Sequence, residues 1–223
     1  MIKSKEAEIL HAQLDILFKK NKASLKNKEQ LDILEKGFVY SQIDVDADIL
    51  IMGINPSLRT DFLTIDSHSY DYSSTANDRY FKKFHQLFED YPAINFTYCD
   101  LFYQRHSEQA QIEHFLKDDP GRTFLKEQLQ ITKSRILKLQ PKCILLFNRR
   151  AASFLTTEWG LMDVQPSKIF AKAEIELVTL KGTEIQLYPS VFLGYRTPKS
   201  TLIKVKSDIS IILNHFKNNL NAD

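Results

Sequence analysis

One short segment restricts the fold of this chain more than any other. Four apolar residues, 49–52, are followed by Gly53-Ile54-Asn55-Pro56-Ser57. An apolar run that stops at a glycine is typical of a strand buried on both faces of a parallel sheet. In open α/β sheets, ligands bind outside the carboxyl ends of the strands. We therefore expect Asn55 to lie at a ligand site, although an asparagine before Pro56 can also serve only to form a turn.

The rest of the chain alternates between strand-like and helix-like segments. Strands are expected at 47–52, 94–99 and 143–147, with two more β-like runs in 168–188, and helices at 4–21, 27–36, 75–91, 107–117, 122–139, 149–156 and 200–218. This alternation predicts a three-layer α/β/α sandwich with a mainly parallel central sheet. We expect residues 1–40 to form an N-terminal helical extension and residues 41–223 to form the α/β/α domain. The long loop at 57–74 is of a length that is usually functional.

Composition limits the class of protein. Hydrophobic residues make up 43% of the chain and charged residues 26%, which is ordinary for a soluble globular domain. No apolar run is long enough to cross a membrane, and the N-terminus lacks the apolar core of a signal peptide. We therefore expect a cytoplasmic, monomeric protein without a membrane partner.

The cysteine and histidine content argues against a metal cofactor. Only Cys99 and Cys143 are present, both in apolar runs, which predicts buried thiols. Two cysteines cannot supply the four ligands of an iron-sulfur cluster. The six histidines show no metal-ligand spacing, so we expect no metal and no other cofactor.

Positive charge is clustered only locally. The formal net charge of +2 is too small to establish a nucleic-acid partner. Clusters occur at Arg149-Arg150 and, near the C-terminus, at Arg196, Lys199, Lys204 and Lys206. Each cluster could contact phosphates or could form a solvated surface.

Four segments resemble, in chain order, the mismatch-specific branch of the uracil-DNA glycosylase superfamily. Residues 53–57 differ from the family's usual Gly-Ile-Asn-Pro-Gly only at the last position, and residues 76–84 resemble its Asn-Arg-Phe-Trp helix start with one residue inserted. The strand exit at 96–102, with Arg105 following, and the Pro-Ser pair in 187–190 resemble two further family segments. The resemblance leaves out the first 40 residues.

This resemblance implies a site that holds a flipped base. Asn55 would position the attacking water, and Gly53 and Pro56 would shape the loop. The backbone N–H of Ile54 or Asn55 would bind a carbonyl of the base. Tyr70 or Tyr72, with Phe62 in reserve, would stack on the base, and Asp100 and Tyr188 would contact its edge. The residues expected to contact DNA are Ser57, Pro189, Ser190, the apolar pair Phe192 and Leu193, and the basic pair Arg196 and Lys199. The apolar loop after Ser190 could instead pack on the core.

Two positions depart from the family pattern. Asp100 stands where some branches carry an asparagine, and a carboxylate accepts hydrogen bonds only when it is ionised. Tyr188 stands where relatives often carry His, Asn or Met, and a tyrosine supplies no positive charge to a departing base. These departures also bear on whether the chain is an enzyme.

The sequence therefore supports a ranked set of functions. The first is monofunctional hydrolysis of the N-glycosidic bond of a deaminated or mismatched, uracil-type base flipped from duplex DNA, as in base-excision DNA repair. The alternative is a non-catalytic member of the same fold that binds nucleic acid or a nucleobase. A different hydrolase on the same scaffold is a third possibility, because fold does not determine function.

Overall fold

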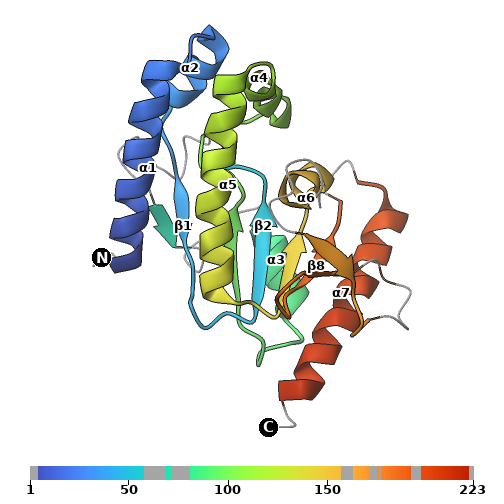
Figure 1. Cartoon of the computed structure of the whole chain (residues 1–223). Coiled ribbons are helices and arrows are strands. Elements are labelled where there is room, and N and C mark those ends of the chain that lie inside the picture. The colour runs from blue at the N-terminus through green and yellow to red at the C-terminus, as the bar shows by residue number, and fades with distance from the viewer. Residues whose placement is uncertain are drawn as a thin grey trace.

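The computed structural model describes residues 5–57, 69–71, 81–156, 163–170, 175, 177–191 and 197–220. Its helices are α1 (Lys5–Ser24), α2 (Lys28–Glu35), α3 (Lys82–Phe88), α4 (Glu113–Leu116), α5 (Asp119–Leu139), α6 (Arg149–Thr156) and α7 (Lys199–Leu220). Its strands are β1 (Tyr40–Gln42), β2 (Ile49–Gly53), β3 (Ser69–Asp71), β4 (Phe96–Asp100), β5 (Cys143–Leu146), β6 (Val164–Pro166), β7 (Val178–Leu180) and β8 (Gln186–Pro189). Figure 1 shows their arrangement.

The main sheet has six strands in the order β4-β2-β5-β8-β7-β6. Strands β4, β2, β5 and β8 are parallel, and β7 and β6 continue the sheet antiparallel. The predicted α/β class with a mainly parallel sheet is confirmed. Because the chain passes from β2 outward to β4 and then to β5 on the other side of β2, the connections change direction beside β2 and β5. This is the topological switch point at which open α/β sheets bind ligands.

Side chains of the parallel strands alternate between two apolar clusters. In β2, Leu50 and Met52 belong to the cluster that holds side chains of α1, α2, α5 and α6. Ile49 and Ile51 belong to the cluster that holds side chains of α3 and α7. Helices therefore cover both faces of the sheet, and the all-apolar sequence of β2 follows from burial on both sides.

The two N-terminal helices share the core of the α/β unit. The ring of Phe18 in α1 lies 5.1 Å from the ring of Phe38 and 5.1 Å from that of Phe124 in α5. At the same contact, Asn21 Nδ2 donates to Glu127 Oε2 over 3.1 Å. Helices α1 and α5 consequently run side by side (Figure 1). The segment expected as an extension is thus packed closely against the sheet-bearing part of the chain.

Several element predictions need correction. Residues 118–121, which lie between two of the expected helices, are the cap and the first residues of α5, because Asp118 Oδ1 accepts a hydrogen bond from the Gly121 backbone N over 2.7 Å and caps the helix. The expected helix at 107–117 is a 3₁₀ turn, Gln109–Ile112, followed by α4. Strands β1, β3 and β6 were not predicted. The expected helix at 75–91 is seen as α3, and residues 72–80 lie outside the described part.

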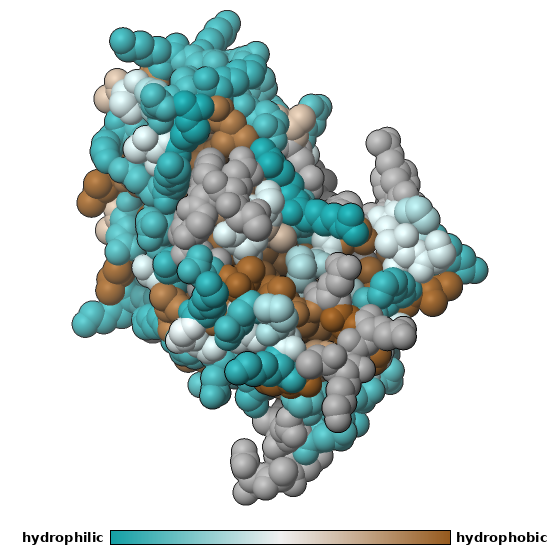
Figure 2. Space-filling view, turned by 45° about the vertical axis from the view of Figure 1, so that its right-hand side comes forward, coloured by the Kyte–Doolittle hydropathy of each residue, from teal (hydrophilic) through white to brown (hydrophobic). Residues whose placement is uncertain are grey.

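Among the helices that the structure describes, none is both long and apolar enough to cross a bilayer. On the face shown in Figure 2, hydrophilic side chains cover most of the area and apolar side chains reach the surface near the centre. The expected cytoplasmic location and monomeric state stay predictions.

Candidate functional site

Polar residues gather where the four parallel strands end, at what we call the carboxyl edge. The residues at these four strand ends are Asp100 on β4, Asn55 after β2, Asn148 after β5 and Ser190 after β8. Backbone hydrogen bonds continue the pairing past the strand ends: Leu101 N to Gly53 O (3.0 Å), Phe147 N to Met52 O (3.3 Å) and Ser190 N to Leu146 O (2.9 Å). The carboxyl edge lies on the side of the sheet from which α6 begins (Figure 1). It includes the switch point beside β2 and β5.

Asn55 has an anchored amide nitrogen and an available carbonyl oxygen. Its Nδ2 donates to the backbone oxygen of Pro56 over 2.9 Å and to that of His106 over 2.8 Å. These two bonds use both amide protons, and two carbonyl acceptors fix which end of the amide is the nitrogen. Within the described residues, nothing donates to Oδ1 of this half-buried side chain. The arrangement therefore presents a neutral, oriented acceptor.

The segment after β4, residues 101–106, holds the loop that contains Asn55 (residues 54–57) in place. Phe102 N donates to Ile54 O over 2.9 Å, and His106 N donates to Pro56 O over 3.3 Å. The side chain of Ile54 is itself buried, which ties the loop to the core. Asn55 is therefore positioned by backbone hydrogen bonds to the residues that precede and follow it, and its orientation depends on the 101–106 segment.

His106 is a neutral part of this support. Burial lowers its pKa to about 4, against an opposing backbone hydrogen bond to Glu108. The imidazole is therefore uncharged at neutral pH. Its Nδ1 lies 2.9 Å from the Glu108 carbonyl oxygen, so Nδ1 carries the proton and Nε2 is the unprotonated nitrogen. Sequence reasoning did not single out His106, because a lone histidine gives no signal of where its backbone carbonyl will point.

Gly53 makes room for a buried side-chain pair. Tyr98 OH donates to Asp100 Oδ1 over 2.8 Å, and Gly53 is paired with Asp100 in the sheet register. A Cβ on Gly53 would overlap with both of these oxygen atoms and would lie 3.2 Å from Tyr98 Cζ. The close approach that requires a glycine is thus made by the protein's own side chains. Asp100 is only 6% exposed, and one of its oxygens is already engaged by Tyr98.

Tyr188 faces α7. Its hydroxyl donates to Asp208 Oδ2 over 2.7 Å, and Lys204 Nζ lies 3.0 Å from the same oxygen. Tyr188 is buried in the cluster formed with α3 and α7. Its hydroxyl proton is therefore used inside the fold, by a carboxylate that sequence reasoning missed. After Tyr188, the chain reaches the carboxyl edge at Pro189 and Ser190. Ser190 Oγ is buried there and has no hydrogen-bond partner among the described residues.

Asn148 begins α6 at the switch point. Its Oδ1 accepts hydrogen bonds from the backbone N of Arg150 over 2.9 Å and of Ala151 over 3.1 Å. The Arg150 guanidinium pairs with Glu113 over 3.1 Å and lies 4.6 Å from the Phe154 ring centre. The predicted turn into a helix is confirmed, and Arg150 is tied into the helical layer.

Several predicted site residues are placed only in part. Tyr72, Phe192, Leu193 and Arg196 lie outside the described residues, as does Phe62. For Tyr70 the structure gives the backbone, in β3 and paired with Ser41 of β1. Ser57 and Lys199 are exposed, Lys199 as the first residue of α7, and Pro56 is buried.

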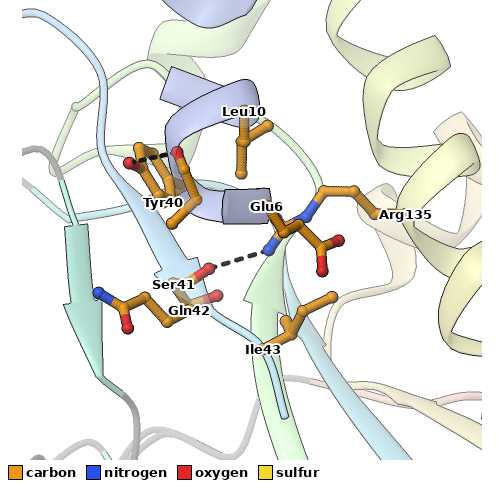
Figure 3. A pocket seen from close by; sticks show the side chains of 8 residues that line it. Glu6, Leu10, Tyr40, Ser41, Gln42, Ile43 and Arg135 are labelled. Atoms are coloured by element: carbon orange, nitrogen blue, oxygen red, sulfur yellow. Dashed lines mark hydrogen bonds between the residues drawn. The ribbon is translucent and has the colours of Figure 1, made fainter. Parts of the chain in front are cut away.

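A small cavity lies away from the carboxyl edge. It is lined by Glu6, Ala7, Leu10, Tyr40, Ser41, Gln42, Ile43 and Arg135 (Figure 3). Its volume of about 20 Å³ holds roughly one water molecule. Arg135 Nη2 crosses it to donate to Ser41 O over 2.9 Å. The cavity is too small for a nucleobase and belongs to the packing of α1 against β1 and α5.

The described residues contain no group of three or more His, Cys, Asp or Glu side chains arranged to hold a metal ion. Cys99 and Cys143 are buried, unpaired thiols, as predicted. Burial raises the pKa of Cys99 to about 12 and raises that of Cys143 as well. Neither thiol is therefore a nucleophile at neutral pH.

Comparison with protein-family models gives no match, and comparison with curated proteins gives none either. A functional assignment therefore depends on the geometry of the carboxyl edge.

Proposed function

We propose that the chain is a DNA glycosylase built on a uracil-DNA-glycosylase-like α/β/α sandwich. It would hydrolyse the N-glycosidic bond of a flipped deaminated or mismatched base by a monofunctional mechanism, without metal or redox cofactor. The observation that carries this proposal is the geometry of Asn55, whose amide nitrogen is fixed by Pro56 O and His106 O so that Oδ1 is left as an acceptor.

The chemistry suits a neutral acceptor. The bond between the sugar C1′ and the base nitrogen breaks largely before water attacks, so the protein needs to position water more than to deprotonate it. Asn55 Oδ1 would accept a hydrogen bond from the water and so direct a water lone pair at C1′. The base would leave with the bonding electrons as an anion, and the proton that the water loses on bonding to C1′ would finally neutralise that anion. Because an amide supplies no negative charge, we expect slow turnover.

The surroundings support a base-binding role. The site is at the switch point of the sheet, where this class of fold binds ligands. One strand away, the buried carboxylate of Asp100 would accept a hydrogen bond from an N–H on the edge of the base. Tyr70 or Tyr72 would provide the stacking surface, since flipped bases are commonly held between apolar or aromatic side chains.

DNA contacts complete the proposal. Residues at or after the ends of β2 and β8 in the chain would carry them: Ser57, Pro189, Ser190, Phe192, Leu193, Arg196 and Lys199. Apolar side chains of such loops can enter the base stack, and basic side chains hold phosphates.

One observation favours a second candidate, a non-catalytic protein that binds nucleic acid or a nucleobase. The hydroxyl proton of Tyr188 is donated to Asp208, so the family-like segment 187–190 offers through this tyrosine neither a cation nor a donor proton to a departing base anion. Such a protein would bind DNA in a salt-sensitive way without releasing a base.

The test is an excision assay with labelled duplexes. The duplexes carry uracil opposite guanine, thymine opposite guanine, hypoxanthine or xanthine, and a single strand that contains uracil is tested separately. Alkali then cleaves each strand at any abasic site. We expect cleavage with at least one substrate by the wild type and by Asn27→Ala, a control that removes an asparagine cap from α2. We expect loss of cleavage in Asn55→Ala. Binding without cleavage on every substrate would favour the second candidate.

A further inference from the structure

Arg105 is a buried arginine for which the described residues provide no counter-ion. The residue is only 6% exposed, and its Nε is buried with no hydrogen-bond partner. In the part of the chain that the structure describes, no carboxylate or carbonyl oxygen pairs with its guanidinium. Three other arginines do have partners: Arg122 binds Leu116 O and Asp119, Arg135 binds Ser41 O, and Arg150 binds Glu113.

An unpaired cation in this position is unfavourable for folding. Burial lowers the pKa of Arg105, because desolvation penalises the charged form, yet an arginine stays protonated in proteins. Buried charges are normally paired, since an unpaired one carries its full desolvation penalty. Side chains that break this rule without compensation inside the fold are concentrated at functional sites.

Arg105 lies beside the candidate catalytic loop. The next residue, His106, donates its backbone N to Pro56 O over 3.3 Å and accepts from Asn55 Nδ2 over 2.8 Å. Arg105 is thus one residue from two of the hydrogen bonds that tie the segment after β4 to residues 54–56. A planar guanidinium with several parallel N–H donors matches the oxygens of a phosphate.

We infer that Arg105 binds a phosphate group, and that this phosphate belongs to the backbone of the nucleic acid whose base reaches Asn55. The second half of the inference rests on the proposed function, whereas the phosphate site itself does not. Arg105 would hold the strand next to the flipped nucleotide and gain there the counter-ion that the described residues do not supply.

The first test is the salt dependence of DNA binding. Each phosphate contact contributes about 0.9 to the slope of log affinity against log salt. Log affinity falls as log salt rises, and we expect this fall to be shallower by about 0.9 in Arg105→Met. Binding at low salt should be weaker by about tenfold or more. The control is Lys142→Gln, which removes one positive charge just before β5, at the opposite edge of the sheet, where Lys142 pairs with Asp48 over 2.8 Å. Equal slopes for the wild type and Arg105→Met would overturn the inference.

The second test separates the two proposals. Without ligand, Arg105→Met should melt at the same temperature as the wild type or higher, because an apolar side chain replaces an unpaired buried charge. At constant ionic strength, inorganic phosphate should raise the Tm of the wild type and of Lys142→Gln but not that of Arg105→Met. Phosphate stabilisation without DNA binding would keep the phosphate site and reject the DNA proposal. A lower Tm for Arg105→Met, or phosphate stabilisation that does not depend on Arg105, would show that the arginine is structural and overturn the inference.

Discussion

Replacement of Gly53 by alanine tests why the segment 53–57 begins with a glycine. The added Cβ would overlap with the hydroxyl of Tyr98 and with Oδ1 of Asp100, two atoms that are hydrogen-bonded to each other over 2.8 Å. Neither atom is the end of an exposed flexible chain, because Tyr98 is 3% and Asp100 6% exposed. Overpacking of a filled core costs about 1–3 kcal/mol. Loss of the Tyr98–Asp100 bond adds about 1 kcal/mol, so we expect Gly53→Ala to lower the free energy of unfolding by about 2–4 kcal/mol.

The measurement is urea unfolding of a double-mutant cycle. Tyr98→Phe removes one of the two overlapping oxygen atoms and lets the Asp100 carboxylate turn. The combination Gly53→Ala with Tyr98→Phe should therefore be less destabilised than the sum of the single changes, by about 1 kcal/mol or more. If Gly53→Ala unfolds at the wild-type urea concentration, or if the two changes are additive, Gly53 does not serve to accommodate this pair.

Two further predictions concern the supports of the fold. The pKa of His106 in the folded protein is about 4, below its ordinary value of 6.5, so the unfolded state takes up the proton first as the pH falls. The free energy of unfolding should therefore be highest above pH 6.5 and should decline by about 3 kcal/mol by pH 4. Chemical unfolding across this range should show the decline in the wild type and a reduced decline in His106→Asn; an unchanged profile in His106→Asn would contradict the assignment. Asp118→Ala removes the side chain that caps α5 and should lower the urea midpoint by an amount equivalent to about 1–2 kcal/mol, whereas the same change at the exposed neighbour Asp119 should have a small effect. Equal midpoints for these two variants would show that the cap contributes little.

The parallel part of the fold could be predicted because its signals are local. β2 and β5 are uninterrupted apolar runs, and α6 begins at Arg149 and ends at Thr156 as the pattern indicates. The start of α5 was missed because Pro120 and Gly121 usually mark a loop. Here the proline fits the first turn, and a side chain at Gly121 would collide with the backbone of Phe115.

Of the candidate site, only the position of Asn55 could be predicted from the sequence. The position of Asn55 follows from the strand that precedes it, but the two carbonyl oxygens that orient it come from Pro56 and from His106, which is 51 residues away. The hydrogen bond between Tyr188 and Asp208 joins β8 to α7 across 20 residues, and no local sequence pattern predicts it. Long-range pairings of this kind depend on tertiary packing, so the sequence gives the candidates but not their partners.

The most direct measurement is the single-turnover rate of base release from duplex DNA, with enzyme in excess, for the wild type and Asn55→Ala. If Asn55 positions the attacking water, the variant should release base at least about 100-fold more slowly while its affinity for the same duplex stays within a few-fold of the wild type. Equal rates of base release would contradict the role assigned to Asn55.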